Sequence, residues 1–185
     1  MKSNIATSIT IFAGLSLFIA SCKKGIDSSF TEAHGKNNFP ASQSISQPHE
    51  RPFKGRITGS FVSTPSSDPA IYKSIADAWG NATQFGVFTK VTSDVINIVS
   101  STVEGTFIMT NQSGEQIKGL YNGIFTFGDT PGTFSWDLDA LVTGGTGRFS
   151  TATGQFVFLA NGKYGIEDGN VKGDYIETFE GIIVY

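Results

Sequence analysis

The chain has 185 residues, of which 39% are hydrophobic and 16% are charged, and its formal net charge is −3. This length supports one medium-sized domain. The low charged fraction excludes a coiled coil and a charge-driven disordered protein. The negative charge argues against nucleic-acid binding, which needs a basic face to displace counterions, so we expect no nucleic-acid partner.

Residues 1–21 are predicted to be a secretion signal. Lys2 precedes an uncharged apolar stretch, residues 5–20, that is short for a membrane span and suits the core of a signal peptide. The stretch ends in Leu17-Phe18-Ile19-Ala20-Ser21-Cys22, which resembles a bacterial lipobox. Cys22, the single cysteine, is therefore the predicted lipidation site. The alternative is an ordinary cleavage site with an incidental cysteine.

A lipidated Cys22 would make the membrane a partner of this protein through a lipid anchor. Stable anchoring takes more than one acyl chain, and lipoprotein cysteines typically carry two or three. Lys23 follows the cysteine, where an aspartate is the usual signal for retention in the inner membrane. The expected location is the bacterial cell envelope, at the outer membrane.

Residues 22–52 are predicted to be the lipidated cysteine and a flexible tether. The segment is rich in Ser, Asn, Gln and Pro and has no apolar period, so it cannot bury enough surface to fold. It holds both histidines, His34 and His49, which we interpret as solvated rather than as a weak metal site. Residues 53–185 contain neither His nor Cys, which excludes His-dependent triads and Cys or His metal sites there. No metal and no cofactor are expected.

The predicted domain, residues 53–185, opens with a strand over 53–62. The next segment breaks the strand pattern, because Asp68-Pro69 is typical of a helix N-cap followed by proline. Ile71, Tyr72, Ile75 and Trp79 would share one face of a short helix, and Gly80 would end it. The alternative for this segment is an irregular loop.

The rest of the domain shows period-2 alternation typical of strands. Turn signals such as Asn161-Gly162 separate the alternating runs. The predicted strands after the first cover residues 82–91, 101–110, 116–127, 133–143, 153–159, 163–171 and 174–185, and 94–100 could extend one of them. Eight strands with short turns favour an all-β, antiparallel, up-and-down barrel, which leaves no exposed edge.

A glycine-rich run carries a family resemblance. The run is Gly144-Gly145-Thr146-Gly147-Arg148-Phe149, followed by Gly154 and a strand. It resembles the Gly-Gly-Thr-Gly-x-Phe turn of plant dirigent proteins and a related turn of allene oxide cyclases, and a broad group of secreted bacterial proteins resembles both. The resemblance implies an eight-stranded calycin-like barrel. The run also makes sense physically as a tight turn whose Phe149 plugs the barrel end, with Arg148 more often structural than catalytic. A phosphate cradle does not fit, because a strand follows instead of a helix.

Two aspartates are the candidate catalytic residues. In dirigent proteins an acidic residue shortly before this turn lines the cavity and helps catalysis, and Asp139 stands at a similar place, with Asp137 on the same face. If that face is the lumen, one of the two carboxyls would stay protonated and could act as an acid. If Trp136, Leu138 and Ala140 face the lumen instead, both aspartates lie in water. The second arrangement follows the hydrophobic rule.

Tyr121, Phe125 and Phe127 share one face of a predicted strand and are the candidate ligand-binding residues. They either line a cavity or fill a barrel whose interior is just wide enough for side chains or one small ligand. The leading hypothesis is a lipid-anchored envelope protein whose soluble barrel binds a small, largely apolar molecule. The alternatives are a non-enzymatic interaction or structural module of the envelope and a dirigent- or cyclase-like enzyme that needs no metal.

Overall fold

The computed structural model of the protein describes residues 49–185. The predicted signal peptide, the lipidation site Cys22, His34 and nearly all of the predicted tether lie outside the described residues. The first strand begins at Glu50, slightly before the expected start of the domain. Within residues 49–185, no helix is long and apolar enough to cross a membrane.

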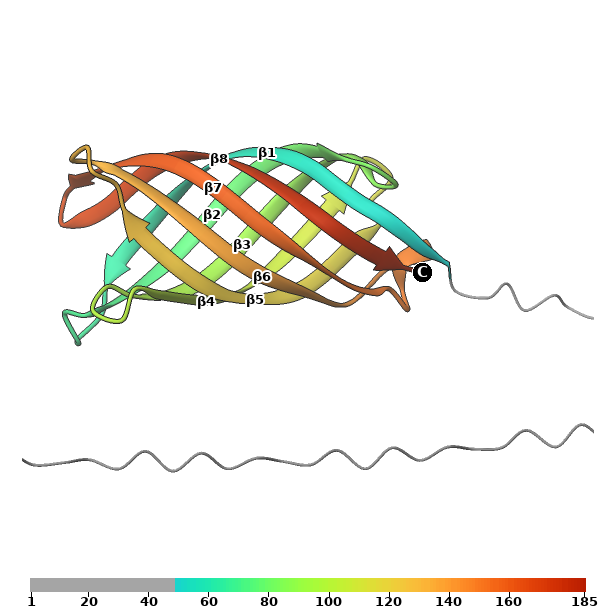
Figure 1. The fold of residues 1–185 in the computed structure, drawn as a ribbon, viewed down its shortest axis with the longest axis horizontal. Helices are drawn as coiled ribbons and strands as arrows, with labels where there is room; N and C mark the ends of the chain where they lie inside the picture. Colours follow the sequence, from blue (N-terminus) through green and yellow to red (C-terminus); the bar gives the residue numbers. More distant parts are fainter. Residues whose placement is uncertain (1–48) are drawn as a thin grey trace, which may run out of the picture. The chain divides into compact units, whose positions relative to one another are not determined.

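Eight antiparallel strands form a closed barrel in which each strand pairs with its neighbours in the sequence and β8 pairs with β1 (Figure 1). This confirms the predicted fold class. A short 3-10 turn, η1, separates β6 from β7. The elements are β1 (Glu50–Pro65), β2 (Ile71–Ala82), β3 (Gly86–Asn97), β4 (Thr102–Asn111), β5 (Gln116–Phe127), β6 (Thr133–Gly145), η1 (Gly147–Phe149), β7 (Thr153–Glu167) and β8 (Asn170–Val184).

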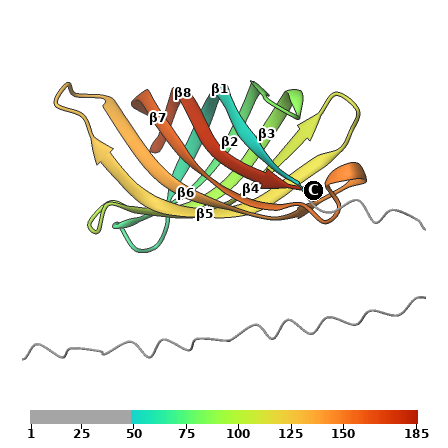
Figure 2. The same ribbon diagram turned by 45° about the vertical axis from the view of Figure 1, so that its right-hand side comes forward.

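The barrel has two different ends, which we call the plugged end and the open end. The plugged end carries η1, the β2–β3 and β4–β5 hairpins, the start of β1 and the end of β8, where Glu50 pairs with Val184 (right in Figures 1 and 2). The open end carries the β1–β2, β3–β4, β5–β6 and β7–β8 connections. Both ends of the described chain segment therefore lie at the plugged end.

Alternate residues of every strand point into the barrel, which is why the sequence alternates. On β6 the inward residues Phe134, Trp136, Leu138, Ala140 and Val142 are buried or partly buried, whereas the residues between them face outward. Phenylalanines dominate the interior near the plugged end, and Phe53, for example, packs edge-on against Phe156 at 5.3 Å between ring centroids. The outer face is mixed, because it carries charged residues such as Asp137 and Asp139 and also exposed large apolar residues such as Trp79 and Ile124.

The helix predicted over residues 68–80 is wrong, and so is the alternative of an irregular loop, because most of this segment is strand β2. Ile75 and Trp79, two of the large residues that suggested a helical face, point outward, and Trp79 is 65% exposed. Apart from Tyr72 at its start, the inward face of β2 consists of small residues, Ser74, Ala76, Ala78, Gly80 and Ala82. Alternation is hard to recognise in the sequence of such a strand, because its buried residues are small and its large apolar residues are exposed.

The turn predicted at Asn161-Gly162 is also wrong, because both residues lie inside the continuous strand β7. Gly162 serves close packing: a Cβ atom there would lie 2.4 Å from the Phe134 ring. The chain turns instead at Asp168-Gly169, where both residues have positive φ angles, 52° and 77°. That pattern is the one that two-residue hairpin turns favour. The two predicted strands 153–159 and 163–171 are therefore one strand, β7. The predicted number of strands is still eight, because β2 was not among the predicted strands and makes up for the one lost.

Candidate functional site at the open end of the barrel

The candidate catalytic residues Asp137 and Asp139 lie on the outer face of β6 and are exposed. Their neighbours Leu138 and Ala140 occupy the lumen. Asp139 lines a broad groove on the outside of the barrel, together with Glu104 and Glu180. The arrangement in which the two carboxylates share the lumen is therefore not the one that the structure adopts.

The candidate ligand-binding residues lie along the inner face of β5 and lead toward the open end. Tyr121 is buried, Phe125 is partly buried, and Phe127 at the rim is 51% exposed. The rings of Phe125 and Phe127 meet edge-on at 4.8 Å between centroids. Both phenylalanines line a cavity, whereas Tyr121 lies deeper in the barrel.

An apolar cavity of about 230 Å³ opens at this end of the barrel, and we call it the mouth. Its size suits a small ligand, although many ligand sites are larger. Its lining is aromatic and aliphatic apart from the hydroxyl groups of one serine and two tyrosines. The residues that line the mouth are Phe61, Ser63, Tyr72, Ile96, Ile98, Phe125, Phe127, Phe134, Tyr164, Ile166 and Val171.

A second, inner cavity of about 40 Å³ lies deeper in the lumen and shares several lining residues with the mouth, among them Phe61, Ile96 and Phe125. A space of this size holds about one water molecule or the end group of a ligand. Its lining differs from that of the mouth, because Lys90, Asp94 and Glu177 contribute to it. A molecule that enters by the mouth therefore meets apolar walls first and charged groups last.

Lys90 and Glu177 form an ion pair inside the barrel. The Nζ atom of Lys90 lies 2.5 Å from Oε1 of Glu177, and the two side chains are only 3% and 1% exposed. The indole N–H of Trp136 donates a hydrogen bond of 3.1 Å to Oε2 of Glu177, and the ammonium lies 3.8 Å from the centre of the Phe158 ring. Burial raises the pKa of the Glu177 carboxyl, while Lys90 opposes that shift.

Sequence reasoning missed this ion pair, although a signal was present. Lys90 interrupts the inward series between Phe88 and Thr92, and Glu177 interrupts the series between Tyr175 and Phe179. A charged residue at an inward position of an alternating strand predicts a buried, paired charge, because an unpaired one would be very costly. Lys90 lies within the predicted strand 82–91 and Glu177 within the predicted strand 174–185, so both signals were present in predicted strands.

Asp94 is a third charged group in the lumen. Its Oδ1 atom is buried and has no hydrogen-bond partner among residues 49–185, and the same holds for the hydroxyl of Ser63. Burial raises the pKa of the Asp94 carboxyl to about 7, against the opposing effect of Lys90. Tyr175, close by on β8, also has a raised pKa because it is buried, so its hydroxyl stays neutral.

Replacing Asp94 by asparagine is expected to stabilise the protein at pH 8 and to have little effect near pH 4. The raised pKa of Asp94 means that the folded state binds the proton more tightly than the unfolded state, so this carboxyl costs stability as the pH rises from about 4 to about 7. Water reaches part of the side chain, so we expect about 1–2 kcal/mol at pH 8. Urea unfolding at both pH values measures the difference, and a variant that is less stable at pH 8 would contradict it.

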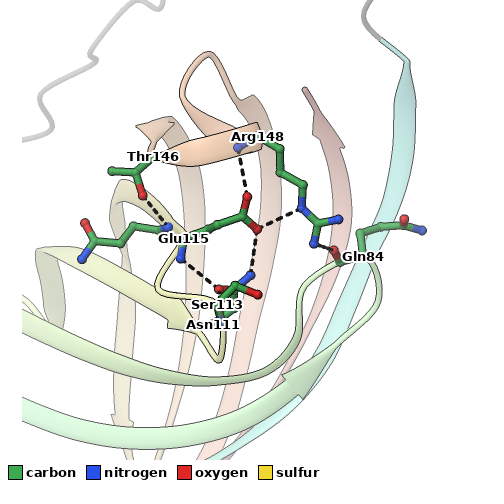
Figure 3. Close-up of polar contacts among 7 residues, drawn as sticks. Gln84, Asn111, Ser113, Glu115, Thr146 and Arg148 are labelled. Atoms are coloured by element: carbon green, nitrogen blue, oxygen red, sulfur yellow. Dashed lines mark hydrogen bonds and ion pairs between the residues drawn. The ribbon is translucent and has the colours of Figure 1, made fainter.

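The glycine-rich motif lies at the opposite, plugged end, where Arg148 joins three segments (Figure 3). Its Nε atom lies 3.1 Å from Oε2 of Glu115 in the β4–β5 hairpin, and its Nη2 atom donates to the carbonyl of Gln84 in the β2–β3 hairpin. The backbone N–H of Arg148 donates to Oε1 of Glu115, and this bond together with the Asn111 amide lowers the pKa of Glu115. These contacts give Arg148 a structural role at this end.

Phe149 fills the plugged end from inside. Its side chain is fully buried and packs against Phe85 at 5.1 Å and Tyr185 at 4.6 Å between ring centroids. The other motif residues form the turn that delivers it: Thr146 accepts a hydrogen bond from the backbone of Gln116 through its hydroxyl. The lumen is thus packed with side chains at the plugged end and contains a cavity at the open end. A filled interior therefore describes one half of the barrel, and a cavity describes the other half.

The described part of the chain holds no group of three or more His, Cys, Asp or Glu residues that could bind a metal ion. The only described histidine, His49, is exposed just before β1. The chemistry that residues 49–185 offer in the lumen is that of two carboxyls, one ammonium and hydroxyl groups.

Comparison with known proteins gives little to add to this geometry. No protein-family model matches the chain, and no curated protein matches it. A solved structure of a pterocarpan synthase dirigent protein matches 74% of this chain and 86% of its own, with 13% sequence identity and a TM-score of 0.33. That likeness is too low to assign a family or an activity.

Proposed function

We propose that this is a lipid-anchored protein of the bacterial cell envelope whose barrel binds a small, largely apolar molecule through its open end. The mouth carries the proposal, because it is an apolar cavity of about 230 Å³ that continues into the lumen. Concave, mostly apolar sites with a few polar groups are the usual form of small-molecule sites. The lipid anchor at Cys22 rests on the lipobox-like sequence alone.

Native mass spectrometry of the protein extracted from its own cells tests both parts. We expect a non-covalent species that disappears on denaturation, and an acylated N-terminal peptide that begins at Cys22. An unmodified peptide would overturn the anchor.

A direct binding test uses N-phenyl-1-naphthylamine, a neutral apolar dye that fluoresces when it leaves water. Ile96 lines both the mouth and the inner cavity, so Ile96→Trp fills the path of the ligand. We expect this variant to weaken dye binding about tenfold, as loss of a well-packed site does. The control is Ile124→Trp on the outer face of the barrel, where the isoleucine is exposed. Equal binding by both variants, or no binding by the parent protein, would overturn the mouth as a binding site.

A further inference from the structure

Two buried polar atoms near the base of the mouth make no hydrogen bond within residues 49–185. Ser63 is 2% exposed and lines the mouth, and its hydroxyl has no hydrogen-bond partner among residues 49–185. Oδ1 of Asp94 has none there either, and Asp94 lines the inner cavity. Buried polar atoms are nearly always satisfied, so an unsatisfied pair at the end of a cavity suits a polar group that enters this cavity.

The pairing of the strands places these two residues in one row. Ser63 of β1 lies opposite Ser74 of β2, and Ser74 lies opposite Asp94 of β3. All three point inward, and they cross the lumen wall where the mouth meets the inner cavity. Gly105 continues the row on β4, where a Cβ atom would lie 2.8 Å from Oδ1 of Asp94. The glycine thus leaves space for the carboxylate.

The charges in the lumen do not balance. Lys90 and Glu177 neutralise each other at 2.5 Å, and Tyr175 stays neutral. An ionised Asp94 therefore adds one negative charge that no cation of the described lumen is left to neutralise.

We infer that the ligand is an amphiphilic amine, whose apolar body fills the mouth and whose ammonium group is held by Asp94 and the hydroxyls of Ser63 and Ser74. This inference rests on the proposed function and adds the chemical class of the ligand. The ammonium donates to the unsatisfied carboxylate oxygen and supplies the missing positive charge. Hydrogen bonds between charged groups are the strong ones, so this contact would dominate selectivity.

The binding of an amine is then pH-dependent. The titratable groups that face Asp94 are Lys90 on its own strand, Tyr121 on β5, and Tyr175 and Glu177 on β8, and the hydroxyls of Ser74 and Thr92 lie beside it. Burial raises the pKa of the Asp94 carboxyl to about 7, whereas a primary alkylamine stays protonated at both pH 8 and pH 5.5. Protons therefore compete with the amine below pH 7, and its affinity is expected to fall about tenfold for each pH unit.

The test compares three probes of nearly equal size that differ in the end group: 4-phenylbutylamine, 4-phenylbutan-1-ol and 4-phenylbutanoate. Each displaces N-phenyl-1-naphthylamine from the purified protein at pH 8 and pH 5.5. At pH 8 we expect the amine to bind at least about tenfold more tightly than the alcohol, and the carboxylate to bind most weakly. At pH 5.5 the advantage of the amine over the alcohol is expected to disappear.

Asp94→Asn is expected to remove the advantage of the amine at pH 8 and to leave the alcohol unchanged. The matched control, Glu104→Gln, removes an exposed carboxylate from the outer face of the adjacent strand β4 and should keep the advantage. Equal affinities of the three probes in the parent protein, or tighter binding of the carboxylate, would overturn the amine while leaving a binding site. If neither the dye nor any probe binds, the proposed function fails as well.

Discussion

Glu177→Gln is expected to destabilise the barrel by about 3–5 kcal/mol. The substitution removes the carboxylate that lies 2.5 Å from the Lys90 ammonium and leaves Asp94 as the other acidic group beside it, and a buried charge that loses its hydrogen-bonded partner is strongly destabilising. Gln keeps a carbonyl oxygen for the indole N–H of Trp136, so the loss reports mainly on the charge. Urea unfolding at pH 7 measures the change in free energy.

The double variant Lys90→Met with Glu177→Gln separates the charge from the packing. It removes both charges from the lumen, and well-packed neutral replacements of buried ion pairs are often neutral or stabilising. We expect the double variant to recover most of the stability lost by Glu177→Gln. A double variant that is as unstable as the single one, or a single variant that loses less than about 1 kcal/mol, would show that the pair is not isolated from water.

Phe149→Ala is expected to cost about 3–5 kcal/mol, as for other buried phenylalanines that leave a cavity. The ring is fully buried between Phe85 and Tyr185, and the surrounding hairpins are held by the hydrogen bonds of Arg148, so the site has little freedom to collapse. Thermal and urea unfolding both measure the loss.

Phe127→Ala is the matched control for Phe149→Ala, since it removes the same ring from the other end of the barrel. Phe127 is partly exposed at the rim of the mouth, so its removal should cost less than about 1 kcal/mol of stability. The same substitution is expected to weaken binding of the apolar dye. Equal loss of stability in the two variants would contradict the division of the barrel into a packed end and an open end.

The sequence predicted the architecture because the alternation on most strands is strong. In the run from Gln116 to Phe127 the inward positions hold aromatic, aliphatic and glycine residues and the outward positions are exposed, and the predicted bounds match those of β5. β2 escaped prediction because its inner face is small and its outer face carries Trp79. Asn161-Gly162 looked like a turn because a local signal cannot show that Gly162 is required under the Phe134 ring.

The candidate site was predicted only in its outer part. The aromatic face of β5 gave Phe125 and Phe127, which line the mouth. The charged base of the site comes from β3 and β8, whose residues are far apart in the sequence and meet only when the barrel closes. Once the register of β2 and β3 is known, Ser63, Ser74 and Asp94 fall in one row, but no local pattern reveals that register.

The pairing of Glu50 with Val184 has a practical consequence for how the molecule can be handled. A bead, a fluorophore or a membrane that is joined to the start of β1 or to the end of β8 is attached at the plugged end of the barrel, whereas the mouth lies at the open end. Immobilisation through either terminus should leave the ligand's route free. A peptide linker between the two strand ends would likewise be short, so a circular permutant opened at Asp168-Gly169 is a feasible format for a sensor built on this barrel.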